Sequence, residues 1–207
     1  MSRRDHTYFF QACRNNMAKY NTYSDAANTA VRAFLTQVGE HYLGEKFNTG
    51  SGSGKKTWES IKKEFANKCA YCNQDPEKLE TEHLQGLNQR EYGLHHPGNV
   101  VPSCNKCNTR RMEEAEDESG RKRKVAVGWK EQLRIICKEK EGKDWEEAFK
   151  KRKEMIESSI NKYNYPSLTE NQQNAIRIMA VDLYNKIKAS GANADTLYVE
   201  LAKSFAE

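Results

Sequence analysis

The chain has 207 residues, of which 37% are hydrophobic and 30% are charged, so it can bury a core while keeping long charged faces. No apolar run approaches the roughly 18 residues that a membrane span needs. Residues 1–16 also lack the long apolar stretch of a secretory signal. We therefore expect a cytoplasmic protein with no membrane partner. The net charge of +5 permits binding to nucleic acid but does not require it.

The N-terminal part of the chain has a helical pattern. Apolar residues recur at three- and four-residue spacing over residues 7–43, which predicts one helix or two, with Ser24 as the cap of the second. Residues 48–54, NTGSGSG, have the composition of a flexible linker. The pattern then predicts a short amphipathic helix over residues 57–67, capped by Thr57.

The composition changes at about residue 66. Residues 66–120 hold four of the six cysteines, three of the five histidines and two clusters of turn-forming residues. Helical periodicity returns afterwards and predicts four helices, near residues 126–140, 143–163, 169–189 and 193–205. Thr169 is an expected cap and Gly191 an expected break. We therefore expect an α+β protein in which helical regions at 1–65 and 121–207 enclose a small metal-binding module.

Two charged stretches stand at the end of this module. Residues 113–118 (EEAEDE) are acidic, and residues 121–124 (RKRK) are basic. One interpretation makes them two solvated faces. The alternative is that the basic cluster meets phosphate groups near the site.

Four of the cysteines form two Cys-x-x-Cys pairs, Cys69 with Cys72 and Cys104 with Cys107. Each pair can grip one metal ion from a tight turn, and two pairs complete a tetrahedral zinc site with four thiolate ligands. In a reducing cytoplasm such cysteines are metal ligands rather than disulfides. A four-thiolate site has no open position, so we expect Zn²⁺ to be structural. The two remaining cysteines are expected to be ordinary buried residues: Cys13 and Cys137.

Cytidine deaminases also use a Cys-x-x-Cys pair, so their chemistry is an alternative for these residues. They need an upstream His-x-Glu and a Pro directly before the cysteine pair. Here Glu82 precedes His83, and Ser103 separates Pro102 from Cys104. A zinc ion held by four thiolates would also carry no water, so we set deaminase chemistry aside.

Further polar residues lie between and beside the cysteine pairs: the dipeptide Glu82-His83, then Asn99, then Asn108 directly after Cys107. This pattern resembles the HNH (ββα-metal) endonuclease family. That family has an acidic residue followed by His, an Asn about fifteen residues later, and a second Asn or His about nine further on. Its zinc-containing members carry Cys-x-x-Cys pairs at the same flanks. The resemblance covers about 50 of the 207 residues.

The resemblance implies a fold for this segment and a role for each residue. Two strands are implied near residues 78–84 and 98–103, with a helix that starts near Cys107. His83 is the implied general base, which suits an imidazole because its pKa lies near neutral pH. Asn99 is implied to fix the loop that positions this histidine.

The resemblance also implies a catalytic metal ion held by Glu82 and Asn108. Phosphodiester hydrolysis needs a cation to neutralise charge on the phosphate, and Mg²⁺ prefers hard oxygen ligands. Glu82 stands where Asp is the commoner residue and reaches one methylene further. Asn108 in place of His favours an oxygen-seeking ion such as Mg²⁺ or Mn²⁺.

Several neighbouring residues lie beside this pattern. Arg110 and Arg111 follow on the same predicted helix, and we expect one of them to contact phosphate. His95 and His96 match no position of the motif and are expected in a solvated loop. The loop that follows His83 contains four polar residues: Gln85, Asn88, Gln89 and Arg90. These either reach base edges or phosphates, or simply form a polar loop.

An HNH module recognises phosphate geometry and carries little sequence specificity of its own. Small stand-alone members imply a restriction or phage-defence nuclease that acts on double-stranded DNA. Cutting both strands with one site per chain implies a homodimer. Two alternatives stay open, a non-catalytic zinc-dependent nucleic-acid-binding module and an RNA-cleaving effector. The binding module would keep the four cysteines without needing the spaced Glu, His and Asn residues.

Overall fold

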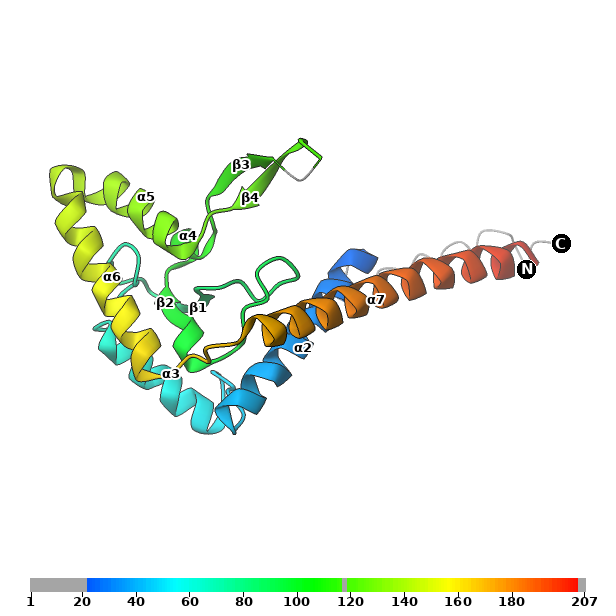
Figure 1. Cartoon of the computed structure of the whole chain (residues 1–207), viewed down its shortest axis with the longest axis horizontal. Coiled ribbons are helices and arrows are strands. Elements are labelled where there is room, and N and C mark those ends of the chain that lie inside the picture. The colour runs from blue at the N-terminus through cyan, green and yellow to red at the C-terminus, as the bar shows by residue number, and fades with distance from the viewer. Residues whose placement is uncertain (1–21, 117–118, 205–207) are drawn as a thin grey trace, which may run out of the picture.

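The computed structural model describes residues 22–116 and 119–204, with side chains as far as residue 197. It is an α+β structure with two small antiparallel sheets (Figure 1). Its helices are α2 (Tyr23–Leu43), α3 (Gly52–Glu64), α4 (Asn105–Asn108), α5 (Trp129–Glu141), α6 (Trp145–Lys162) and α7 (Glu170–Ser204). Its strands are β1 (Glu80–His83), β2 (Val100–Ser103), β3 (Met112–Glu116) and β4 (Lys122–Ala126), and its 3-10 turns are η1 (Pro97–Asn99) and η2 (Gly142–Asp144).

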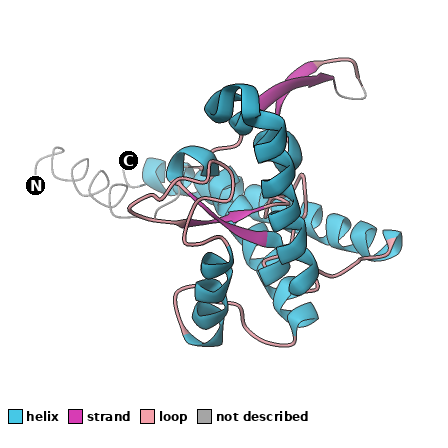
Figure 2. Cartoon of the chain, turned by 90° about the vertical axis from the view of Figure 1, so that its left-hand side faces the viewer, coloured by secondary structure: helices cyan, strands magenta, loops and turns pink. Residues whose placement is uncertain are grey.

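The helices surround the first strand pair and leave the second one outside. Helices α2 and α7 lie side by side and form an arm that extends away from the body (Figure 1). Helices α5 and α6 pack against each other on the opposite side. Figure 2 shows β1 and β2 among the helices, whereas β3 and β4 project beyond them. No helix in the described part of the chain is both long and apolar enough to cross a bilayer.

The central hairpin matches the strands expected near residues 78–84 and 98–103. Strand β1 pairs antiparallel with β2, with Glu80 opposite Ser103 and His83 opposite Val100. Helix α4 follows β2 after one residue and begins at Asn105, slightly earlier than expected. The order of strand, strand and short helix is therefore present, although this order alone identifies no family.

One hydrophobic core joins the central hairpin to the helices around it. It includes Phe47, Ile61 of α3, Tyr71 of the first cysteine pair and Leu133 of α5. Cys137 is fully buried in the same core, as the sequence predicted. Burying one such large apolar side chain stabilises a fold by about 1.5–3 kcal/mol. The small hairpin thus depends on helices from both flanks for its stability.

A second core holds the arm against the loop that precedes η1. Val31 and Leu35 of α2 and Ile176 and Ala180 of α7 enclose Leu94, and all five side chains are buried. These four positions on the helices follow four-residue spacing, which places each pair on one face. The loop between β1 and η1 is therefore anchored to the arm.

The start of α2 differs in detail from the prediction. Thr22 caps this helix instead of Ser24, because its Oγ1 accepts a hydrogen bond of 3.1 Å from the Asp25 amide. The predicted helical segment at 7–21, with Cys13, lies outside the described residues.

The predicted flexible linker is partly wrong, because α3 begins inside it. Ser51 occupies the N-cap position, and Thr57 lies inside the helix, where its hydroxyl donates to the Ser53 carbonyl. Gly54 packs tightly on the neighbouring loop, since a Cβ there would lie 2.3 Å from the Asn48 amide nitrogen. Gly54 thus permits a close contact between α3 and this loop. The glycine- and serine-rich composition alone suggested a flexible linker instead.

Helix α7 is continuous where the sequence predicted two helices. Gly191 lies inside it, and a Cβ at this position would meet the Tyr23 ring at 2.2 Å. This glycine lets α2 approach α7 and does not break the helix. The predicted cap is confirmed, because the Gln172 amide donates to Thr169 Oγ1 while Gln172 Oε1 accepts from the Thr169 amide.

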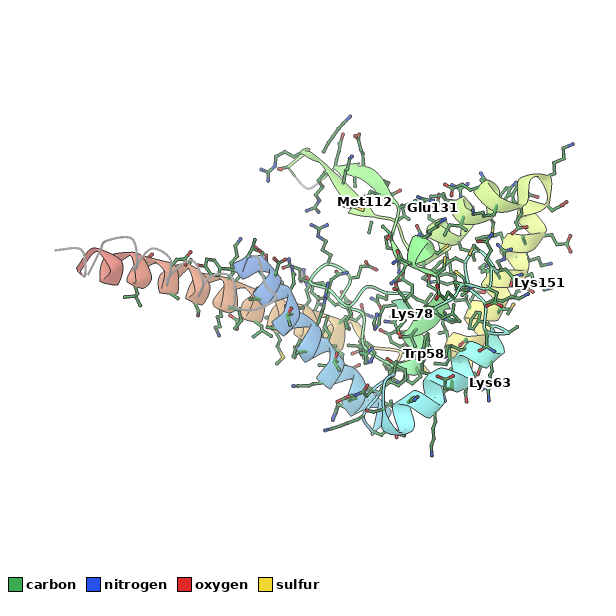
Figure 3. The ribbon with its side chains drawn as sticks, turned by 180° about the vertical axis from the view of Figure 1, so that it is seen from behind. Trp58, Lys63, Lys78, Met112, Glu131 and Lys151 are labelled. Carbon is green, nitrogen blue, oxygen red and sulfur yellow. The ribbon has the colours of Figure 1, made fainter. Side chains whose placement is uncertain are left out.

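The two charged stretches form a hairpin that the sequence did not predict. The acidic strand β3 pairs with the basic strand β4, so that Glu114 lies opposite Lys124 and Glu116 opposite Lys122. Opposite charges at facing positions stabilise such a pair modestly. Figure 3 labels Met112 at the start of this hairpin, where the side chain is 53% exposed. An exposed two-stranded ribbon lacks the alternating apolar pattern that predicts strands.

Candidate functional site

The sulfur atoms of the four paired cysteines converge on one point. Their Sγ atoms all lie within 4.8 Å of one another, and those of Cys72 and Cys104 are 3.8 Å apart. Tetrahedral zinc with Zn–S bonds of about 2.3 Å requires sulfur atoms about 3.8 Å apart. The group can therefore bind a metal ion, and its geometry and ligand chemistry are consistent with zinc.

Local hydrogen bonds shape the two turns that carry these cysteines. In the first turn the Asn73 amide donates to the Cys69 carbonyl across 2.8 Å, with Asn73 in the left-handed region at φ 55°. The Ala70 amide donates to the Pro102 carbonyl, which ties this turn to β2. In the second turn Cys104 is the N-cap residue of α4. Both cysteine pairs are thus fixed to the end of β2.

The four sulfurs cannot all be thiolates unless a cation joins them. Hydrogen bonds from Cys107 and Cys72 hold the pKa of Cys69 far below its usual range. The hydrogen bonds of Cys107 with Cys69 and Cys72, together with burial and the negative charge on Cys69, raise the pKa of Cys107. A divalent cation would remove this conflict, because it stabilises every thiolate that it binds.

His83 ends β1 and makes a direct contact with a second histidine. Its Nε2 lies 2.9 Å from Nδ1 of His95, and Nε2 of His95 lies 2.8 Å from the Phe47 carbonyl oxygen. Burial is the main cause that lowers the pKa of His83 to about 3, with smaller contributions in the same direction from His95 and from the charges of Arg110 and Arg32. His83 is therefore a neutral imidazole at neutral pH.

Glu82 faces away from His83, as neighbours in a strand do. Its Oε1 accepts a 2.6 Å hydrogen bond from Nε of Arg110, and both side chains are largely buried. The same guanidinium donates to the carbonyl oxygens of His83, Leu84 and Val127. Burial raises the pKa of Glu82, and the Arg110 charge opposes this shift. Arg110 thus uses its donors inside the protein.

Asn108 lies beside an acidic residue that sequence reasoning missed. Its Nδ2 donates a 2.8 Å hydrogen bond to Oε2 of Glu80. Glu80 precedes Glu82 by two residues, so both carboxylates project from the same face of β1. This two-residue spacing was the signal in the sequence that could have identified Glu80.

Asn99 closes the loop between β1 and η1. Its Oδ1 accepts from the Gln85 amide, and its Nδ2 donates to the carbonyl oxygens of Gln85 and Leu94, all within 2.8–2.9 Å. The side chain is almost completely buried. Gln85 lies two residues after His83, and Leu94 directly precedes His95. Asn99 therefore fixes both ends of the loop that joins these two histidines.

Gln132 of α5 supports the segment around Asn108, and no pattern in the sequence indicated it. Its Nε2 donates to the carbonyl oxygens of Cys107 and Thr109, each at 3.1 Å. Its Oε1 accepts from the Arg111 amide at 2.9 Å. The side chain is fully buried, so these bonds are shielded from water.

The candidate residues are close in the fold but are not all in contact. Within the described residues, no hydrogen bond joins the side chains of Glu82 and Asn108, or links either of them to the imidazole of His83. Each side chain has another partner instead: Arg110 for Glu82, Glu80 for Asn108 and His95 for His83.

The expected solvated loop for the two unmatched histidines is wrong. His96 is 2% exposed, and its Nδ1 accepts from the Gly98 amide at 3.1 Å. Gly98 permits this burial, since a Cβ there would lie 2.8 Å from Tyr165. His95 is half-buried against His83.

Of the remaining polar candidate residues, one faces solvent and two support the loop in which they lie. Arg111 is half-exposed and pairs with Glu139 at 2.7 Å, so it still faces solvent. In the loop after β1, Asn88 Oδ1 accepts from the amides of Arg90 and Glu91. Gln85 Nε2 donates to the Glu91 carbonyl. Gln85 and Asn88 therefore build the loop itself.

Comparison of the chain with protein-family models, with curated proteins and with solved structures found no match. The resemblance to HNH endonucleases therefore rests on the motif alone, and the function has to be argued from the site.

Proposed function

We propose that this chain is a metal-dependent endonuclease of the HNH type, which hydrolyses phosphodiester bonds in DNA. The observation that carries the proposal is the make-up of one four-residue strand. Strand β1 carries a neutral imidazole, His83, and two carboxylates, Glu80 and Glu82, and it lies against the helix that bears Asn108. A base and hard oxygen ligands are the two requirements of phosphodiester hydrolysis.

In this proposal His83 removes a proton from the attacking water. Its low pKa makes the free imidazole a weak base, because burial and nearby arginines disfavour the imidazolium. The negative charge of a bound phosphate would oppose these effects and raise the pKa of His83. Basicity would therefore rise when the substrate is in place.

Mg²⁺ or Mn²⁺ would supply charge neutralisation at the phosphate when bound. Glu82 and Asn108 are the ligands that the motif implies, and Glu80 adds a third oxygen donor on the same face. The carboxylates and the amide oxygen fit such hard cations. The guanidinium of Arg110 holds the Glu82 carboxylate in this region until a cation competes for it.

The four-cysteine centre has a structural role in this proposal, with Zn²⁺ as its ion. Asn108 directly follows Cys107, and successive residues of a helix point about 100° apart. A metal ion at Cys107 would therefore set the direction of the Asn108 side chain. Zinc would act through geometry and would not be a reactant.

Double-stranded DNA is the proposed substrate, in a restriction or phage-defence role. Arg32 on α2 is exposed and has no ion-pair partner among the described residues, and it lies near enough to lower the pKa of His83. Arg32 and the half-exposed Arg111 are candidates for phosphate contacts. A homodimer would bring two sites to the two strands.

One observation favours a second candidate, the non-catalytic zinc-dependent nucleic-acid-binding module. Glu82 and Asn108 both have partners inside the protein, Arg110 and Glu80, so neither side chain needs a cation to be satisfied. A binding module would keep these contacts as plain supports of the fold.

Incubation of the purified chain with three substrates tests the proposal. The substrates are unmodified plasmid, methylated plasmid and single-stranded RNA, each with Mg²⁺, with Mn²⁺ or with a chelator of divalent metal ions. Metal-dependent nicking or linearisation of either plasmid supports the DNA endonuclease. Cleavage of RNA alone would favour the RNA-cleaving effector. Binding without cleavage of any substrate would favour the non-catalytic module.

A further inference from the structure

The imidazoles of His83 and His95 form a chain that ends on a backbone carbonyl. His83 Nε2 lies 2.9 Å from His95 Nδ1, and His95 Nε2 lies 2.8 Å from the Phe47 oxygen. A carbonyl oxygen only accepts hydrogen bonds, so His95 Nε2 must carry a hydrogen. Burial lowers the pKa of His95, which favours its neutral form with one ring hydrogen.

These facts fix the direction of the bond between the two rings. A neutral His95 with its hydrogen on Nε2 presents Nδ1 as an acceptor. His83 Nε2 must then donate, which leaves Nδ1 of the neutral His83 without a hydrogen. We infer that His95 is a positioning residue, which holds the ring of His83 in place and leaves His83 Nδ1 as the basic nitrogen.

His95 is itself held by parts of the chain outside the motif. The Phe47 ring packs on its imidazole, with centroids 4.8 Å apart. Helix α2 packs on its backbone at Gly39, where a Cβ would lie 2.4 Å from the His95 carbonyl oxygen. The preceding Leu94 amide donates to the Tyr165 hydroxyl. The orientation of His83 therefore depends on α2, the loop after it and the segment before α7.

The consequence of this inference for activity rests on the proposed function, because only a base needs a defined free nitrogen. The hydrogen-bond direction does not depend on it. Two measurements therefore separate the inference from the proposed function: the tautomer of His83 and the rate of cleavage.

The first measurement is long-range ¹H–¹⁵N NMR of the ¹⁵N-histidine-labelled full chain with its metal bound. His83 signals are assigned by their loss in His83→Ala. We expect the Nε2-protonated tautomer in the unmodified protein and in His95→Asn, whose Oδ1 replaces the Nδ1 acceptor. We expect a mixture of tautomers in His95→Leu. Protonation of His83 on Nδ1 in the unmodified protein would overturn the inference even if a variant fails to fold.

The second measurement is the steady-state rate of DNA cleavage by the same variants. His95→Leu should lower kcat by about 10- to 100-fold with KM little changed, as expected when a supporting residue of a functional histidine is lost. His95→Asn should recover most of the rate. Full activity in His95→Leu, with His83 still protonated on Nε2, would overturn the inference. If the unmodified protein cleaves nothing, the proposed function fails, while the NMR result still decides the inference.

Discussion

Arg110 donates its Nε hydrogen to Glu82 Oε1 across 2.6 Å, and this ion pair joins β1 to the segment that follows α4. The side chains of Arg110 and Glu82 are only 13% and 9% exposed. The remaining donors of Arg110 meet backbone carbonyls, including that of His83. Arg110 thus connects β1, the strand that carries the proposed base, to the segment between β4 and α5 that contains Val127.

Replacing Arg110 with Leu should therefore destabilise the protein strongly. The change leaves the Glu82 carboxylate buried without its charge partner, a loss that costs about 3–5 kcal/mol in buried pairs. Urea unfolding at pH 7 measures it. Arg111→Leu is the matched control, because its pair with Glu139 is half-exposed and such pairs contribute about 0–1 kcal/mol. Equal losses in the two variants would contradict the structural role of Arg110.

Removal of the metal from the cysteine centre should unfold its surroundings. We expect about one zinc ion per chain by metal analysis, and a fall in Tm when a strong chelator is added. Cys107→Ser should lose the ion, because serine is a poor zinc ligand. Cys137→Ala, which changes a buried thiol outside the cluster, should keep the ion. Retention of zinc by Cys107→Ser would contradict the four-cysteine site.

Gln132→Leu should affect both stability and the proposed activity. The carbonyls of Cys107 and Thr109 and the amide of Arg111 would lose their partner, and each buried unpaired group costs about 1–3 kcal/mol. Asn108, within this segment, would lose its fixed position. Urea unfolding and cleavage rates measure the two effects. Gln37→Leu, at an exposed position on α2, is the matched control and should change stability little, so equal losses in the two variants would contradict this role.

Acid should destabilise the protein partly through His96. Burial lowers its pKa from 6.5 to about 4, so below pH 6.5 the unfolded chain takes up a proton that the folded chain does not. The stability from neutral His96 is therefore complete above pH 6.5 and is lost as pH falls toward 4, by roughly 2 kcal/mol between pH 7.5 and 5.

Urea unfolding across this pH range, in the presence of zinc, measures the loss. His96→Asn keeps an oxygen for the Gly98 amide but does not titrate, so its stability should fall less with pH. His41→Asn, at an exposed position on α2, should behave like the unmodified protein. An unchanged slope in His96→Asn would exclude His96 as a source of the acid sensitivity.

Features with local signals could be predicted from the sequence. The spacing of the cysteine pairs predicted the metal cluster, because two ligands in one tight turn need only two residues between them. Thr169 and Gln172 define a helix start within four residues, and the structure confirms it. Apolar periodicity located the main helices. Each of these signals acts within a few residues along the chain.

Features that depend on contacts between distant residues could not be predicted. From the sequence alone, Gly191 is expected to break a helix. In the structure, Tyr23, which is far away in sequence, packs against this glycine. The pairing of His83 with His95 depends on the fold of the loop between them. The acidic and basic stretches pair as β3 and β4 through charges that, by composition alone, also fit two solvated faces.

The measurement that tests the proposed nuclease most directly is plasmid cleavage by His83→Ala beside His41→Ala, each checked for zinc content. The unmodified protein and His41→Ala should cut in Mg²⁺ or Mn²⁺ at similar rates. His83→Ala should be slower by about 10²–10⁴-fold, the usual contribution of a general base, while keeping its zinc. Cleavage by His83→Ala at the unmodified rate, or no cleavage by the unmodified protein, would contradict the assignment of His83 as the base of an HNH endonuclease.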